Sequence, residues 1–225
     1  RVSSIATAAF ADTYDLNKGS VTVKTKDDGI TYVTQENTEI NDHQDDTGVT
    51  ITSYGKQTEN TITVDTAKDQ TTDVTLQDVN IQKDQWSSGS AAMTIKGEGD
   101  TEIELNGDNT LISGNRHAGL EKADDVSKGS LTIKDDLNND NRTEKEKDES
   151  GYSTGGDTGT LAVIGGGECG ASIGGQGTLD RWKEPSVTDT AERHSTSNIT
   201  ITGGNISAGY IPTVSYTHLT LPTIA

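Results

Sequence analysis

The sequence predicts an all-β fold in which short strands are stacked as successive coils. Bulky apolar residues are scarce: 29% of the 225 residues are hydrophobic, 4% are aromatic, and there is a single Phe. Apolar-x-apolar triplets nevertheless recur along the chain, which is the alternation of a strand with one buried face. A stack of coils needs only a few inward side chains per coil, so these observations together favour a single-stranded parallel β-helix.

Seven triplets mark the expected strands, and their spacing of 28, 25, 29, 28, 30 and 38 residues is typical of repeated supersecondary units. They are Val21–Val23, Val49–Ile51, Val74–Leu76, Ile103–Leu105, Leu131–Ile133, Leu161–Val163 and Ile199–Ile201. We expect the seven triplets to lie in register along one wall of about seven coils. Parallel crossover connections are right-handed in most proteins, so we expect a right-handed β-helix.

A second small-apolar element follows several triplets after a bend rich in Gly, Asn and Asp. These elements are Ala91–Ile95, Ala118–Leu120, Ala171–Ile173 and Ala208–Tyr210. Gly and Asn tolerate the left-handed backbone of tight bends, so each coil is expected to contain two or three strands. The alternative is an antiparallel β-sandwich of many short strands, which would be expected to have more aromatic residues and less glycine.

Two long polar stretches interrupt the pattern, at residues 134–158 and 177–197. Both are too polar to contribute to a core, and we expect them to project from the coils as loop insertions.

The two ends of the chain differ from its interior. Residues 1–11 end in Ala9-Phe10-Ala11 and are interpreted as the remnant of a secretory signal peptide. Residues 12–213 are assigned to the β-helix domain, which we expect to be truncated at its C-terminus. Residues 214–225 resemble a translated sequencing-library adapter and are interpreted as a non-native tail. A secretory signal predicts a secreted or cell-surface protein.

The charge balance restricts the partners. The chain has 36 Asp and Glu residues against 18 Lys and Arg residues, a net charge of −18. This excess of negative charge disfavours nucleic acids and anionic lipids and favours cations, above all calcium, which prefers oxygen ligands. No run of eighteen or more apolar residues is present, so no membrane insertion is expected.

Several segments carry a resemblance to a known group of proteins: "GSVTV" and "GITYV" near the start, "HAGLEKADDVSKGSLTI", "GGGECGASIGGQG" and "SNITITGG". Over residues 12–211 the chain resembles secreted bacterial carbohydrate-binding-domain proteins. These are similar to calcium-binding, polysaccharide-binding right-handed β-helices related in shape to pectate lyases. The resemblance implies a module that binds a polysaccharide or a host or bacterial surface glycan, and it transfers no catalytic motif.

One loop has the beginning of a calcium-binding pattern. The candidate ligands are Asp135, Asp136, Asn138 and Asp140. Oxygen side chains at alternate positions resemble the opening of a calcium loop, but Asn141 and Lys147 break the EF-hand pattern. The prediction is therefore a looser calcium site, and the alternative is a solvated acidic insertion.

Aromatic residues in polar surroundings are the candidates for sugar binding. Trp86 and Trp182 both lie in polar segments, and Tyr152 lies in the acidic insertion. An exposed indole can stack on a sugar ring through its apolar face while Arg181 and Glu184 bind hydroxyl groups beside it. The alternative is that each indole covers apolar surface at the edge of a coil.

Together these features predict a non-catalytic surface module that binds polysaccharide, with calcium in a structural role. A structural or adhesive stalk acting through protein–protein contacts is the first alternative, and a polysaccharide lyase-like enzyme is the second. A lyase would need a cationic or basic group beside a calcium-bound acid sugar. His117 is interpreted as a structural residue at a coil corner and Cys169 as a small buried core residue, so no catalytic residue is predicted. The sequence does not indicate an oligomeric state.

Overall fold

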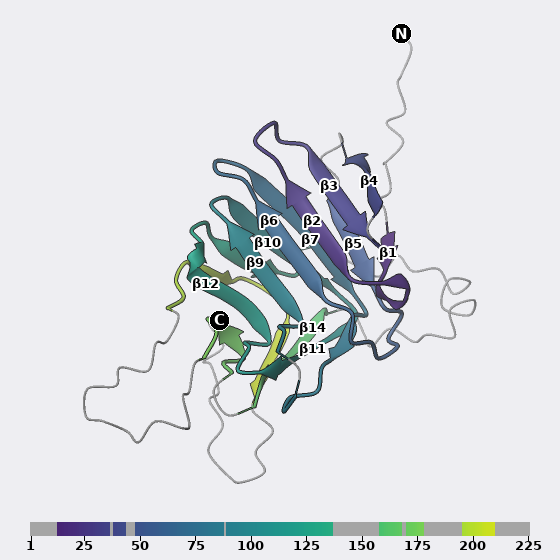
Figure 1. Ribbon diagram of the computed structural model, residues 1–225, viewed down its shortest axis with the longest axis vertical. Helices are drawn as coiled ribbons and strands as arrows, with labels where there is room; N and C mark the ends of the chain where they lie inside the picture. Colours follow the sequence, from purple (N-terminus) through teal and green to yellow (C-terminus); the bar gives the residue numbers. More distant parts are fainter. Residues whose placement is uncertain are drawn as a thin grey trace.

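The computed structural model describes residues 13–36, 38–43, 48–87, 89–136, 158–167, 170–177 and 195–209. This part of the chain is all-β apart from a 3-10 turn, η1 (Leu16–Lys18), and its strands form three sheets (Figure 1). Within it, no helix is long and apolar enough to cross a membrane.

The three sheets are named A, B and C, with strands given in their order across each sheet. Sheet A contains β1 (Thr13–Asp15), β5 (Val49–Thr52), β7 (Thr71–Gln77), β10 (Asp100–Asn106), β13 (Leu131–Lys134) and β16 (Ile199–Ile201). Sheet B contains β15 (Ile173–Gly174), β12 (Leu120–Ser127), β9 (Met93–Gly97), β6 (Ile62–Thr66), β2 (Val21–Thr25), β3 (Thr31–Gln35) and β4 (Thr38–His43). Sheet C contains β17 (Asn205–Gly209), β14 (Thr160–Gly166), β11 (Asp108–Asn115) and β8 (Asn80–Gln82).

The chain visits the sheets in a recurring order. From β7 onward it passes from sheet A to sheet C to sheet B, and each return adds a strand beside the previous one. Every pairing between the described strands is parallel except β2–β3 and β3–β4, which form an antiparallel meander at one end of sheet B. Parallel sheets joined in this way argue against the antiparallel β-sandwich and agree with the predicted parallel strands.

The prediction that all seven triplets share one wall is wrong for two of them. Five lie in sheet A, where the triplets that begin at Val49, Val74 and Ile103 are in register. The triplets Leu131–Ile133 and Ile199–Ile201 are in register with each other but are shifted by two residues, because Ile133 lies opposite Ile103. Two triplets lie elsewhere, Val21–Val23 in β2 of sheet B and Leu161–Val163 in β14 of sheet C. The physical reason is that every wall buries one face of its strands, so all three walls have the same alternation and the triplet does not identify its wall.

The core lies between the inward faces of the three sheets. Each sheet contributes a row of fully buried aliphatic side chains, for example Leu76 and Leu105 from sheet A, Ile95 and Leu120 from sheet B, and Leu111 from sheet C. Burying each such side chain stabilises the fold by about 1.5–3 kcal/mol. The scarce apolar residues are therefore concentrated on one side of each strand.

The bend from sheet A to sheet C shows why Gly and Asp recur there. Asp78 and Gly107 both have left-handed backbones, with φ of 54° and 65°, and lie in successive bends. The Asp78 Oδ1 atom accepts a hydrogen bond from the Asp108 backbone N–H at 3.0 Å. A Cβ atom on Gly107 would collide with the Asp78 carboxylate, so the second bend requires glycine.

Candidate functional site

The outward face of sheet C is formed by two rows of side chains that cross its strands. The first row is Gln82, Ile112, Ile164 and Gly209, and the second is Asn80, Thr110, Ala162 and Ser207. The residues between these positions, Ile81, Leu111 and Val163, are buried in the core. Because side chains alternate along a strand, the two rows point away from the core, and Ile112 and Ile164 remain half-buried.

Residues 57–59 extend this face beyond the edge strand β8. Thr58 forms a parallel bridge with Ile81. The Thr58 N–H donates to the Asn80 carbonyl at 3.0 Å, and the Gln82 N–H donates to the Thr58 carbonyl at 2.9 Å. Residue Glu59 therefore continues the row that contains Gln82 and Ile112.

An open pocket of about 400 Å³ lies where this face meets the loop after β8. It is lined by Gln57, Glu59, Gln82, Lys83, Asp84, Gln85, Trp86 and Ile112. The Trp86 side chain is unusual for an indole in a folded protein, because 52% of its surface is exposed. The pocket thus combines one exposed aromatic ring with amide and carboxylate groups.

Hydrogen bonds fix the loop that carries Trp86. The Asp84 carboxylate accepts a hydrogen bond from the Trp86 backbone N–H at 2.9 Å and another from the Ser87 hydroxyl. These bonds, the Ser87 hydroxyl first and the Trp86 N–H second, hold the pKa of the Asp84 carboxyl below its ordinary value. The charged carboxylate therefore orders the turn that presents the indole.

Two further contacts attach the loop to neighbouring segments. The Lys83 N–H donates to the Ile112 carbonyl at 2.9 Å, and its ammonium Nζ donates to the Glu59 carbonyl at 2.7 Å. The Gln85 side-chain amide reaches the Gly165 carbonyl at 3.4 Å. Three segments distant in sequence are thereby held around one pocket.

The lowered pKa of Asp84 gives a testable acid limit for the Trp86 loop. A carboxyl whose folded-state pKa is depressed keeps its ordering effect above the ordinary value of 3.8 and loses it only as the pH falls through the lower, folded-state value. In a Trp182→Phe background, where Trp86 is the sole indole, we expect its fluorescence maximum to be constant from pH 7 to about 4 and to shift below that.

The control is Asp84→Ala in the same background, which should show the shifted spectrum already at pH 7 and no acid transition, with circular dichroism reporting that the sheets persist. A transition midpoint above pH 3.8 in the protein with Asp84 intact would contradict the assignment.

Two of the four predicted calcium ligands can be placed. The Asp135 carboxylate accepts a hydrogen bond from the Gly159 N–H at 3.0 Å, and the Asp136 N–H donates to the Glu104 carboxylate at 3.2 Å. The first bond joins the two ends of the polar insertion, and the second joins its start to β10. Asn138 and Asp140 lie outside the described residues. Within the described ranges, no three His, Cys, Asp or Glu side chains are grouped as a metal site requires, and the calcium site stays a prediction.

The remaining predicted sugar-binding residues cannot be compared with the pocket. Tyr152, Arg181, Trp182 and Glu184 lie outside the described part of the chain, as do Cys169, the signal remnant 1–11 and the tail 214–225. Trp86 is therefore the predicted residue that the structure places at a concave surface. Sequence reasoning missed its neighbours Gln57, Gln82 and Ile112, because no local signal distinguishes them from other outward-facing residues.

His117 lies at the corner between β11 of sheet C and β12 of sheet B. Its Nδ1 atom lies 2.8 Å from Glu121 Oε2, which also accepts the Ala118 N–H at 3.2 Å, and the His117 and Glu121 side chains are only 16% and 12% exposed. The His117 carbonyl accepts a hydrogen bond from the backbone N–H of Gly166 in β14 at 2.9 Å. These contacts explain His117 as part of the corner.

No protein-family model, curated protein or solved structure matches the chain. The resemblance to secreted carbohydrate-binding β-helices therefore stays a prediction from the sequence.

Proposed function

We propose that this chain is a non-catalytic module that binds polysaccharide through the Trp86 pocket. We further infer that its scaffold is a right-handed parallel β-helix, with one coil for each of the six strands of sheet A. The recurring order of sheets and the parallel pairing support this winding, and right-handed crossovers are the rule for parallel strands. Secretion to the medium or the cell surface belongs to the same proposal and is supported by residues 1–11 of the sequence.

The observation that carries the proposal is the half-exposed Trp86 ring at the edge of an open pocket. An indole left in water costs free energy unless a ligand covers its apolar face. A sugar ring offers apolar C–H groups for stacking and hydroxyl groups that amides and carboxylates can bind. Gln57, Gln82 and Glu59 provide such groups around the ring.

Substitution of the indole is the direct test. We expect Trp86→Ala to weaken retention on immobilised polysaccharides about 30-fold, as loss of a central aromatic contact worth about 2 kcal/mol would do. The thermal midpoint should be unchanged because the ring is exposed. The measurement is a glycan array followed by affinity electrophoresis, performed with and without a chelator so that a calcium requirement is detected.

The matched control is Tyr32→Ala, an aromatic residue of β3 on the outward face of sheet B, which should bind as the unsubstituted protein does. If the Trp86 and Tyr32 variants bind equally well, the Trp86 pocket is not the site at which polysaccharide binds. Loss of binding in Trp182→Ala alone would move the site to the second polar insertion. New ultraviolet absorbance from polyuronate would instead support the lyase alternative.

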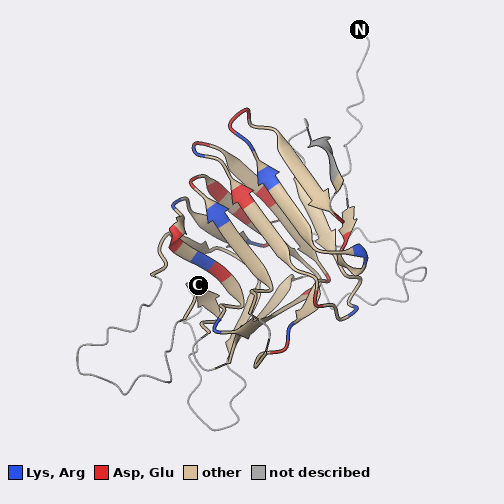
Figure 2. Ribbon diagram, in the orientation of Figure 1, with Lys and Arg blue, Asp and Glu red and all other residues tan. Residues whose placement is uncertain are grey.

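The stalk alternative is favoured by a different observation, the outward face of sheet B. Lys24, Asp65 and Lys96 lie in register on three adjacent strands, visible as a blue, red and blue row in Figure 2. The Lys24 ammonium pairs with Asp65 Oδ2 at 3.1 Å. A regular charged wall of this kind fits a protein partner better than a sugar, because exposed ion pairs contribute specificity more than affinity. A glycan array without any signal would favour this alternative.

A further inference from the structure

Sheet C is almost uncharged although the protein has a net charge of −18. Strands β8, β14 and β17 contain no charged residue, and β11 contains only Asp108 at its start. The Asp108 carboxylate accepts a hydrogen bond from the Thr160 hydroxyl at 3.0 Å. By contrast, the other two sheets carry charges on their outward strand positions, as the coloured bands of Figure 2 show. A face kept neutral in an acidic protein is suited to an uncharged ligand.

The outward face of sheet C also has an apolar strip that begins in the Trp86 pocket. Ile112 lines the pocket, and its neighbours across the strands are Ile164 and then Gly209. Beside this strip runs the row of amide, hydroxyl and methyl groups that contains Thr110 and Ser207. Strands are about 4.8 Å apart, which is close to the length of one pyranose unit in an extended chain. Strand β11 therefore offers one apolar and one polar side chain, Ile112 and Thr110, whereas β14 offers the apolar pair Ile164 and Ala162. Strand β8 offers the amide pair Gln82 and Asn80.

The charges at the start of this strip oppose acidic ligands. The pocket has the carboxylates of Glu59 and Asp84, while the Lys83 ammonium is already bonded to the Glu59 carbonyl. An anionic glycan would meet these carboxylates and the negative field of the whole chain, whereas a neutral glycan would not.

On the basis of the proposed function, we propose that the ligand is an uncharged polysaccharide in an extended conformation. It lies across the strands of sheet C, from the Trp86 pocket over Ile112 and Ile164 towards Gly209. Affinity then increases with chain length until the strip is covered.

The test uses linear neutral β-glucan and β-mannan oligosaccharides from dimer to hexamer, with polygalacturonate as the anionic probe, measured by calorimetry. We expect the affinity of the unsubstituted protein to rise with length and to be lowest for polygalacturonate. Ile164→Asp should bind dimers normally and lose about tenfold in affinity for the hexamer, a difference of about 1.4 kcal/mol. Ala162→Glu, at an outward position of the same strand, is a second variant with the same expectation if Ile164→Asp does not fold.

The control is Thr63→Asp on the outward face of sheet B, which should leave the length dependence unchanged. If Trp86→Ala abolishes binding but both sheet C variants keep the full length dependence, the path across sheet C is wrong while the proposed function stands. Tighter binding of polygalacturonate than of neutral chains would overturn the charge argument. If no oligosaccharide binds the unsubstituted protein, the proposed function itself fails.

Discussion

Gly129→Ala is expected to lower the free energy of unfolding by about 3 kcal/mol, the upper end of the usual cost of overpacking. Gly129 lies in the turn from sheet B to sheet A, and a Cβ atom there would collide with the carbonyl oxygen of Gly99, in the turn between β9 and β10. A Cβ atom on Gly99 would in turn collide with the carbonyl oxygen of Ala67, in the turn between β6 and β7. Backbone atoms cannot yield as side chains can, so these neighbouring turns would have to separate.

The turns are held at this spacing by hydrogen bonds from one turn to the next. The Lys128 N–H donates to the Gly97 carbonyl at 2.8 Å, and the Ser130 N–H donates to Asp100 Oδ1 at 2.7 Å. Separation of the turns would therefore cost these bonds as well as packing. In a chain of this length, 3 kcal/mol corresponds to a fall of roughly 6–12 °C in the thermal midpoint.

Gly89→Ala is the matched control, because a Cβ atom on Gly89 would meet nothing within 4 Å. Its thermal midpoint should stay within about 1 °C of the parent or rise slightly, since alanine restricts the unfolded chain more than glycine does. If Gly129→Ala and Gly89→Ala have equal midpoints, the neighbouring turns are not in backbone contact at this corner.

The strand content could be predicted because alternation is a local property. Residues such as Val74 and Leu76 face the core in any sheet that buries one side, and the triplet pattern identifies them without knowledge of the partner strand. The wall to which a triplet belongs depends on the lengths of the bends and insertions before it. Leu161 follows the long polar insertion. Its assignment to sheet C rather than sheet A depends on where the chain rejoins the sheets after that insertion.

Side-chain networks between strands that are distant in sequence could not be predicted from the sequence either. Four buried threonines form a chain of hydroxyl contacts where sheets B and A meet. The Thr72 Oγ1 atom lies 2.6 Å from Thr25 Oγ1 and 2.7 Å from Thr66 Oγ1. The Thr66 Oγ1 atom lies 3.3 Å from Thr101 Oγ1. These residues are far apart in sequence, and threonine in a strand is expected for its β-propensity alone. Their contacts exist only once the register is fixed.

For the candidate site, the sequence could identify Trp86 because a tryptophan in a polar segment is unusual. It could not identify Gln57 or Gln82, because glutamine is common on exposed surfaces and nothing local distinguishes a binding amide from a solvated one. Their placement around Trp86 results from the parallel bridge between Thr58 and Ile81, a contact between segments that are distant in sequence.

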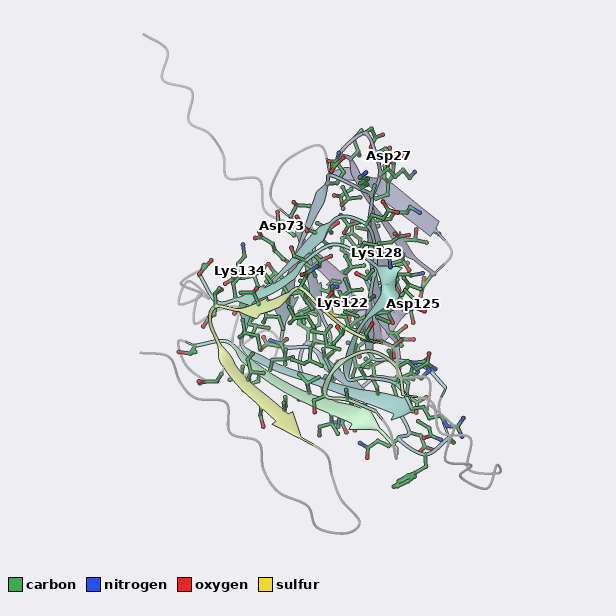
Figure 3. All side chains as sticks on the ribbon, turned by 90° about the vertical axis from the view of Figure 1, so that its left-hand side faces the viewer. Asp27, Asp73, Lys122, Asp125, Lys128 and Lys134 are labelled. Atoms are coloured by element: carbon green, nitrogen blue, oxygen red, sulfur yellow. The ribbon has the colours of Figure 1, made fainter. Side chains whose placement is uncertain are left out.

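Lys122→Ala is expected to destabilise the protein by about 3 kcal/mol or more, as truncation of a fully buried long side chain does. Lys122, labelled in Figure 3, is fully buried in β12, and its ammonium donates to the Ser197 carbonyl at 3.0 Å and to the Ser127 carbonyl at 3.4 Å. It also lies 3.8 Å from Asp124 Oδ1. Alanine would leave a cavity and would remove this donor from the buried Ser127 carbonyl and from the carbonyl of the exposed residue Ser197, and urea unfolding measures the loss.

Ser127→Ala is the control at the same place. The Ser127 hydroxyl is buried and has no hydrogen-bond partner among the described residues, so its removal should change stability by less than about 1 kcal/mol. Equal losses in Lys122→Ala and Ser127→Ala would contradict the contribution assigned to the Lys122 side chain.

The pH dependence of stability separates the charge of Lys122 from its volume. Burial lowers the pKa of the Lys122 ammonium below its ordinary value of 10.5, and attraction to Asp124 opposes this in part. The unfolded chain therefore holds this proton more tightly, so the buried charge costs stability below the folded-state pKa, and the cost disappears as the pH rises towards 10.5. Lys122→Met keeps the volume and removes the titration. We expect the free energy of unfolding of the parent to rise relative to that of Lys122→Met over the alkaline range below pH 10.5, because only the parent recovers the cost of a buried charge. A difference between the two proteins that stays constant or shrinks as the pH rises would contradict this assignment. It would mean that the ammonium is as well solvated in the fold as in the unfolded chain.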